Sequence, residues 1–169
     1  MDEVLKEAIV ERDSLFNNMQ TIIISTVDKN GKPNASYAPS LMHEGNFYVY
    51  VSMLSKHTSN LIKNKKASIM ILEDESKSER LFARKRITMD VDSIIVKRDS
   101  AEWVHIMDLM QSKFGESIAF LRNLKDFFLI NLKTSKALLV YDFGKAFTLT
   151  GKNLNDINHM NDKGHTKSK

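Results

Sequence analysis

The chain has 169 residues, 42% of them hydrophobic and 27% charged, with a formal net charge of +4. This length and composition are typical of one globular domain that buries its own hydrophobic core. Because the chain has no cysteine, disulfides, thiol nucleophiles, iron–sulfur clusters and thiolate zinc sites are excluded, and its scattered lysines argue against nucleic acid as a partner.

The N-terminal segment is acidic and amphipathic. Apolar residues recur at helical spacing over residues 2–20 and predict a helix. A secretory or transit peptide has a different pattern, and no apolar stretch approaches the roughly 20 residues that cross a bilayer. We therefore expect a cytoplasmic protein with no membrane partner.

An antiparallel meander follows this helix. The β-branched run at 21–27 predicts a strand, and the Asn30-Gly31 dipeptide after it is typical of a hairpin turn. The next elements are a strand at 33–41, a turn at 43–46 and a strand at 47–51.

The rest of the chain alternates strands with short helices. Thr58 or Ser59 is expected to cap a brief helix that ends at Lys63. Asp99 and Ser100 open a helical pattern that Gly115 stops, with a second short helix at 117–124. The remaining strands are predicted at 67–72, 84–97, 127–132, 137–141 and 146–150, with turns at Thr134-Ser135 and Phe143-Gly144 between the last three.

Strands dominate this pattern over helices, and the chain becomes polar after Gly151. Tight turns join most of the strands, and the long crossovers of a parallel sheet are missing from the pattern. We expect a mainly β fold, in which an antiparallel barrel is closed or partly closed and carries peripheral helices.

Common catalytic motifs are missing from the sequence. It contains no G-x-G-x-x-G, no P-loop, no G-x-S-x-G and no H-E-x-x-H. The five histidines are too dispersed to form a zinc pair at helical spacing.

Residues 55–60 (SKHTSN) gather polar groups at a strand-to-helix junction. Ser55, Lys56 and His57 supply a hydroxyl, a cation and an imidazole beside backbone N–H groups. Such a junction suits a phosphate or a propionate, although ordinary helix capping explains the same residues.

Two arginines open the long strand predicted at 84–97. Because side chains alternate across a strand, Arg84 and Arg86 are expected to share one face with Thr88. A carboxylate, a phosphate or a propionate between the two guanidinium groups would offset their repulsion. A pair of exposed surface arginines is the alternative.

The last seven residues, 163–169, are too polar to pack into a core. They read either as a solvated end or as a flexible arm that presents His165. On composition alone, the solvated end is favoured.

These segments together resemble the pyridoxamine-phosphate-oxidase-like, FMN-binding split barrels, and more narrowly the HugZ-type haem-degrading proteins of bacterial iron acquisition. The similarity runs from about Asn17 to the end of the chain. It is carried by the strand–hairpin start and by SKHTSN, FARKRIT (82–88), KDFFLINL (125–132), FGKAF (143–147) and the tail with His165.

The resemblance implies a dimer of split barrels with haem between the protomers. Residues 1–151 would form the barrel domain with its N-terminal helix, and residues 152–169 a haem-ligating arm. His165 would be the axial iron ligand, with His159 as the nearby competitor. Asp126 of the other subunit would bond the second nitrogen of that ligand and so tune the iron.

Two further residues, His57 and Thr21, match functional positions of the family. Ser55, Lys56, Arg84 and Arg86 are our own candidates for contacts with the propionates or with the distal side of haem.

The implied activity is that of a haem oxygenase. Haem would be both cofactor and substrate, cleaved to a biliverdin-type tetrapyrrole with release of iron and carbon monoxide. Electrons would come from an external donor. Two alternatives stay open: an FMN-dependent oxidoreductase and a non-enzymatic haem carrier or store. The segment around Ser55 offers fewer arginines and lysines than the flavin pattern, so FMN is the less favoured cofactor.

Overall fold

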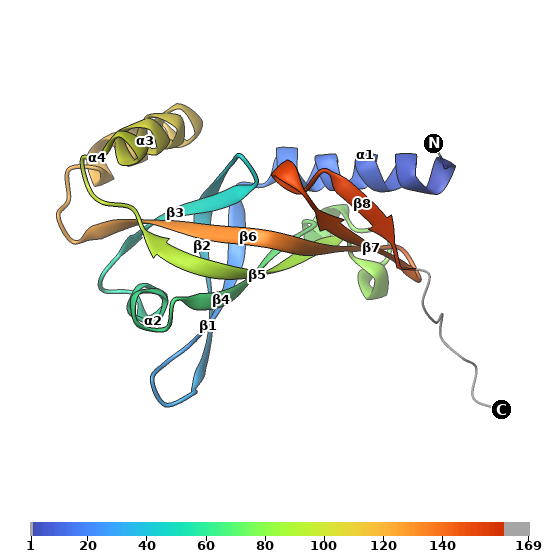
Figure 1. Ribbon diagram of the computed structural model, residues 1–169, viewed down its shortest axis with the longest axis horizontal. Coiled ribbons are helices and arrows are strands. Elements are labelled where there is room, and N and C mark those ends of the chain that lie inside the picture. The colour runs from blue at the N-terminus through green and yellow to red at the C-terminus, as the bar shows by residue number, and fades with distance from the viewer. Residues whose placement is uncertain (1, 161–169) are drawn as a thin grey trace.

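The described residues form a single antiparallel sheet that closes on itself through its long sixth strand (Figure 1). The structure is a computed structural model, and it describes residues 2–160. Its strands are β1 (Thr21–Val27), β2 (Pro33–His43), β3 (Asn46–Ser52), β4 (Lys66–Leu72), β5 (Arg86–Ile95), β6 (Phe127–Tyr141), β7 (Lys145–Thr150) and β8 (Asp156–His159). Its α-helices are α1 (Glu3–Asn18), α2 (Lys56–Asn64), α3 (Ala101–Phe114) and α4 (Glu116–Leu121), with short 3₁₀ turns η1 (Glu75–Lys77), η2 (Leu81–Ala83) and η3 (Lys152–Leu154).

Six strands form the barrel. They follow the order β3-β2-β1-β4-β5-β6, and the pairing of β3 with β6 closes the ring. Only residues 40–43 of β2 pair with β3, so residues 33–39 diverge from β3 and leave the barrel split on that side. The predicted mainly β, antiparallel split barrel is confirmed.

β6 belongs to two parts of the sheet at once. Residues 127–132 pair with β3 in the barrel, whereas residues 137–141 pair with β7 beyond it. The predicted turn at Thr134-Ser135 is therefore wrong, because the chain passes through it as a continuous strand. A register shift between Met89 and Val91 of β5 takes up the irregularity as a bulge.

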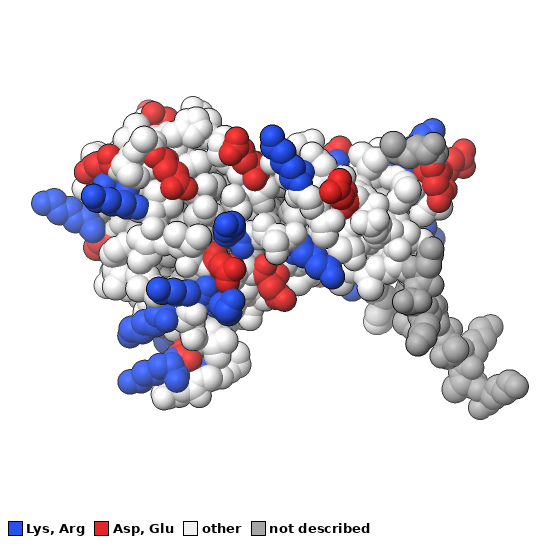
Figure 2. Space-filling view, in the orientation of Figure 1, with Lys and Arg blue, Asp and Glu red and all other residues white. Residues whose placement is uncertain are grey.

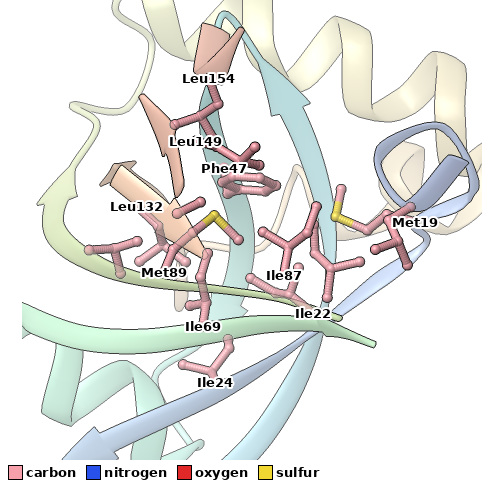
Figure 3. Close-up of a cluster of buried hydrophobic side chains, with 14 of the residues drawn as sticks. Met19, Ile22, Ile24, Phe47, Ile69, Ile87, Met89, Leu132, Leu149 and Leu154 are labelled. Atoms are coloured by element: carbon pink, nitrogen blue, oxygen red, sulfur yellow. The ribbon is translucent and has the colours of Figure 1, made fainter. Parts of the chain in front are cut away.

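The hydrophobic core lies inside the barrel and consists mainly of the inward-facing side chains of the strands (Figure 3). Ile22, Ile24, Phe47, Ile87 and Leu132 are all buried there. Burial on β1 and β5 follows the two-residue period from which these strands were predicted, whereas β3 is buried on both faces.

The polar stretch after Gly151 contains structure that the sequence did not indicate. Leu154 of η3 is buried in the core, and β8 pairs with β7. Arg12, a buried side chain of α1, donates to the carbonyl oxygens of Leu154 and Asn155, each at 3.4 Å. α1 therefore holds the last turn and strand against the sheet.

Helix α2 begins earlier than predicted, with Ser55 rather than Thr58 or Ser59 at its N-cap position. Thr58 is completely buried, so it faces the barrel instead of capping the helix. The predicted start and stop of α3 are confirmed, since Ser100 accepts from the N–H of Trp103 and Gly115 ends the helix. Among the residues described, no helix is long and apolar enough to span a membrane.

The turn between β2 and β3 packs closely on η3. Glu44 and Gly45 both have positive φ, as in the two-residue turns that favour glycine. A Cβ at Gly45 would lie only 2.9 Å from the Cα of Asn153, so this position also requires glycine for space.

Candidate functional site

The opening in the barrel is a groove of about 560 Å³, which we call the split groove. Residues 34–39 of β2 and 50–52 of β3 form its walls, residues 55–57 at the start of α2 lie at its end, and Phe127 completes it. Three of the predicted site residues, Ser55, Lys56 and His57, therefore line one groove.

His57 is held in the wall of this groove with only 8% of its surface exposed. Its Nδ1 lies 2.9 Å from the Oγ of Ser36, and burial lowers the pKa of the imidazole below its usual value of 6.5. The imidazole is therefore neutral near pH 7 and able to donate or accept one proton.

Lys56 adds positive charge at the mouth of the groove. Figure 2 shows lysine and arginine side chains gathered over α2 and the β1–β2 hairpin. The exposed lysines of these segments are Lys29, Lys32, Lys56, Lys63 and Lys65. A carboxylate or phosphate that approaches this end of the barrel meets a favourable field.

Asp126 lies beside the same end of the split groove. It is exposed, immediately precedes Phe127, and its carbonyl oxygen accepts from the N–H of Met53 at 2.8 Å. The structure therefore brings Asp126 near the start of α2.

Thr21 and Arg86 lie on a second surface, the outer face of the sheet. Cross-strand pairing sets Leu72 opposite Arg86, Arg86 opposite Val140 and Val140 opposite Ala146. The register of β1 with β4, continued by two residues, sets Thr21 opposite Leu72. One row across the outer sheet face thus runs through Thr21, Leu72, Arg86, Val140 and Ala146.

The surroundings of this row are apolar. Exposed or half-buried apolar residues of this row and the next are Ile23, Tyr37, Met70, Leu72, Leu138 and Val140, with Thr88 and Thr148 between them. A largely apolar surface of this kind is typical of an interface or a ligand site.

Arg84 lies just before β5, between η2 and the strand, so only Arg86 and Thr88 of the predicted trio alternate on β5. The guanidinium of Arg84 donates to the carbonyl oxygen of Glu73, and that of Arg86 donates to the carbonyl oxygen of Arg84 at 3.2 Å. Each arginine therefore has a partner within the chain.

The two candidate histidines of the C-terminal segment differ in what can be said of them. His165 lies outside the described residues, which end at Met160. His159 belongs to β8 opposite Phe147, and their rings are 4.7 Å apart. Since Phe147 is buried under α1, His159 is on the opposite face of the sheet from Thr21 and Arg86.

Sequence reasoning missed Ser36, the hydrogen-bond partner of His57. It lies on the inward-facing side of β2, and its own hydroxyl also donates to the carbonyl oxygen of Ile24 at 3.3 Å. The alternation of β2 was the only signal for its orientation, and nothing local links it to a residue 21 positions later.

Within residues 2–160, no three His, Asp or Glu side chains come together as a metal site would require.

Comparison with known proteins identifies a family and a relative. The family model of pyridoxamine 5′-phosphate oxidase matches residues 8–141. The heme oxygenase HutZ of Vibrio cholerae is 40% identical over 148 residues, which is 88% of this chain and 84% of that protein.

Solved structures agree with these matches. HutZ from Vibrio cholerae, there described as a heme storage protein, matches with a TM-score of 0.75 and 36% identity, over 78% of this chain and 93% of that chain. Campylobacter jejuni ChuZ matches with a TM-score of 0.84 and 26% identity, over 96% of this chain and 66% of that chain. The same Vibrio protein is thus described once as an enzyme and once as a store.

Proposed function

Since this chain belongs to the pyridoxamine 5′-phosphate oxidase family, we propose that it is a haem oxygenase, a homodimer that opens haem to a biliverdin-type tetrapyrrole with release of iron and carbon monoxide. The observation that carries the proposal is geometric. The last described residue, Met160, bonds to the carbonyl oxygen of Ala146, at one end of the row that contains Thr21 and Arg86. The chain therefore continues toward His165 from the edge of that surface.

The residues on this surface fit the chemistry of haem. Haem has a large apolar ring and two carboxylates, and it needs an apolar surface with cations at its margin. The outer sheet face supplies the apolar side chains, Arg86 lies among them, and Lys56 belongs to a lysine-rich end of the barrel. Bound haem supplies an iron that activates dioxygen while the ring is itself the substrate.

We assign His165, on the C-terminal arm formed by residues 152–169, as the axial ligand of the haem iron. The face that His159 occupies supports this assignment, because its ring lies against Phe147, on the face of the sheet opposite Thr21 and Arg86. η3 and β8 then form the first part of the arm, and Arg12 holds this part in position.

We assign Asp126 as the acceptor of a hydrogen bond from the second nitrogen of that imidazole. This bond would fix the tautomer of the imidazole and raise the basicity of the iron ligand. The hydroxyl of Thr21 would hold the water that delivers a proton. Arg86 would steer the propionates or the distal contacts, and Arg84 would support it through its carbonyl. Ser55, Lys56 and the neutral His57 would bind from the split groove.

The length of β6 supports a site shared by two subunits. Asp126 precedes Val140 by 14 residues, or roughly 45 Å of strand at about 3.3 Å per residue. His165 lies five residues past Met160, which is opposite Ala146 and thus near Val140, and five residues reach at most about 18 Å. With the two residues separated in this way, a site shared by two protomers in contact through the outer sheet face would bring the side chains together more readily than one protomer would.

Haem degradation of this kind draws electrons from an external donor, which we infer to be a cellular reductant of the cytoplasm. Release of iron would make the protein a source of iron from haem. FMN is not required by this scheme, and the neutral His57 beside Lys56 leaves the groove with fewer cations than a flavin phosphate usually meets.

Hemin titration of the full-length protein tests the proposal. We expect a Soret band with hemin, and its loss on addition of ascorbate under air with formation of a biliverdin-type product. His165→Ala should abolish turnover and weaken haem binding, and Asp126→Asn should weaken binding or turnover by about 10–100-fold.

His159→Ala is the matched control and should bind and degrade haem as the unmodified protein does. Loss of activity in His159→Ala with retention in His165→Ala would reverse the ligand assignment. A stable Soret band in the presence of reductant would favour the storage function, and FMN released from the purified protein by heat would favour the oxidoreductase.

A further inference from the structure

Arg98 lies between β5 and α3, and its side chain reaches the loop that joins α4 to β6. Its Nη2 donates to the carbonyl oxygens of Arg122 at 2.7 Å and Leu124 at 3.1 Å. Its guanidinium also lies over the Trp103 ring, 5.0 Å from the ring centroid. A planar guanidinium can bridge two acceptors in this way and keep its orientation.

Tyr50 of β3 supports the same loop. Its hydroxyl accepts from Nη1 of Arg98 at 3.2 Å and is directed at the carbonyl oxygens of Leu121 and Arg122, at 3.3 and 3.5 Å. Tyr50 is 8% exposed, and its ring packs on Phe127. The first half of the loop is thereby tied to the barrel wall.

The far end of the loop carries Asp126. There the loop is held by the backbone bond from the N–H of Met53 to the Asp126 carbonyl oxygen, at 2.8 Å, after which β6 begins. Arg98 and Tyr50 therefore fix the segment that sets where the exposed carboxylate of Asp126 lies.

We propose that Arg98 is a positioning residue for Asp126, and that through it Arg98 tunes the hydrogen bond to the iron-ligating imidazole of His165. This inference rests on the proposed function. A strong bond from an imidazole to a carboxylate raises the basicity of the ligand and stabilises the ferric state. Loosening the loop should weaken that bond and raise the reduction potential of the bound haem.

The experiment compares Arg98→Met with Arg122→Met in the full-length protein. Methionine keeps the apolar stem over Trp103 but removes the donors. Arg122 is a matched control, because its guanidinium also lies near Trp103, at 5.6 Å, but bonds to Asp108 and Gln111 of α3 rather than to the loop carbonyls.

Two readouts besides turnover are informative. In the apoprotein, amide hydrogen exchange over residues 123–126 should accelerate in Arg98→Met, and by more than in Arg122→Met, which removes only the bonds from residue 122 to α3. In the hemin complex, Arg98→Met should raise the reduction potential and lower the iron–imidazole stretching frequency, in the same direction as Asp126→Asn and by no more. The double variant with Asp126→Asn should match Asp126→Asn alone.

An unchanged potential in Arg98→Met, or effects of Arg98→Met and Asp126→Asn that simply add, would overturn the inference while leaving the proposed function intact. An unchanged potential in Asp126→Asn would overturn both the inference and the role proposed for that carboxylate. If Arg98→Met does not fold, Arg98→Lys and Tyr50→Phe test the same restraint, since each removes part of the loop contacts and should shift the potential in the same direction.

Discussion

The imidazole of His57 makes the stability of the split groove depend on pH. Burial lowers its pKa in the folded protein, so the folded chain binds fewer protons than the unfolded chain as the pH falls below 6.5. The stability that His57 contributes is therefore complete above its unfolded pKa and is lost as the pH decreases through its folded pKa.

We expect His57→Gln to reduce this acid sensitivity. Glutamine retains a group that can bond to the Ser36 hydroxyl but does not titrate. The melting temperature of the apoprotein, measured between pH 7.5 and 5, should fall less steeply in the variant. Equal slopes for the two proteins would mean that His57 is not the group that titrates.

For single residues, the sequence predicted which side chains face outward better than it predicted their hydrogen-bond partners. Alternation along β1 and β5 is a local property, so Thr21 and Arg86 could be assigned to a surface from the pattern alone. Arg84 could not, because its partner is the carbonyl oxygen of Glu73, in a loop that has no periodicity. The contact between His57 and Ser36 likewise depends on how β2 diverges from β3.

Among the elements, β8 is the strand that the sequence pattern did not predict. Its four residues, Asp156–His159, are mostly polar, and they form a strand because β7 offers a free edge and Leu154 enters the core. The turn predicted inside β6 was wrong for a related reason. Thr134 and Ser135 read as turn residues, yet Thr134 pairs with Val91 of β5, and after a bulge the pairing with β5 resumes at Ala137.

Arg12 is expected to be the main restraint on η3 and β8. Arg12→Met removes the donors to the Leu154 and Asn155 carbonyl oxygens, and an unpartnered buried carbonyl costs about 1–3 kcal/mol. Hydrogen exchange should accelerate over residues 152–160 while the barrel strands stay protected.

Lys6→Met is the control for this comparison, because Lys6 is exposed on the same helix. Equal exchange over residues 152–160 in Arg12→Met and Lys6→Met would show that the packing of Leu154, and not the guanidinium, secures the last strand.

The molecule as a whole is elongated along β6, with α3 and α4 at one end and β7 and β8 at the other (Figure 1). This shape separates Asp126 from the start of the C-terminal segment. A site that needs both His165 and Asp126 is therefore complete only when the opposite ends of two molecules come together.

Pairing two inactive variants tests this arrangement. In a purified heterodimer of His165→Ala with Asp126→Asn, one site would combine the intact His165 of one subunit with the intact Asp126 of the other, and the second site would lack both. We expect haem turnover to reappear in the heterodimer, although neither homodimer has it at the level of the unmodified protein. A heterodimer no more active than the better homodimer would contradict a shared site.

The close approach of Gly45 to Asn153 also bears on how the chain folds. The β2–β3 hairpin consists of local contacts and can form early. The barrel closes only when β3 pairs with β6, which lies much later in the chain. During synthesis, η3 emerges only after all of these strands. The β2–β3 turn on which η3 packs is therefore synthesised long before η3 itself. The segment that leads to His165 thus has its anchor in the first third of the chain, and η3 docks on strands that have all been synthesised before it.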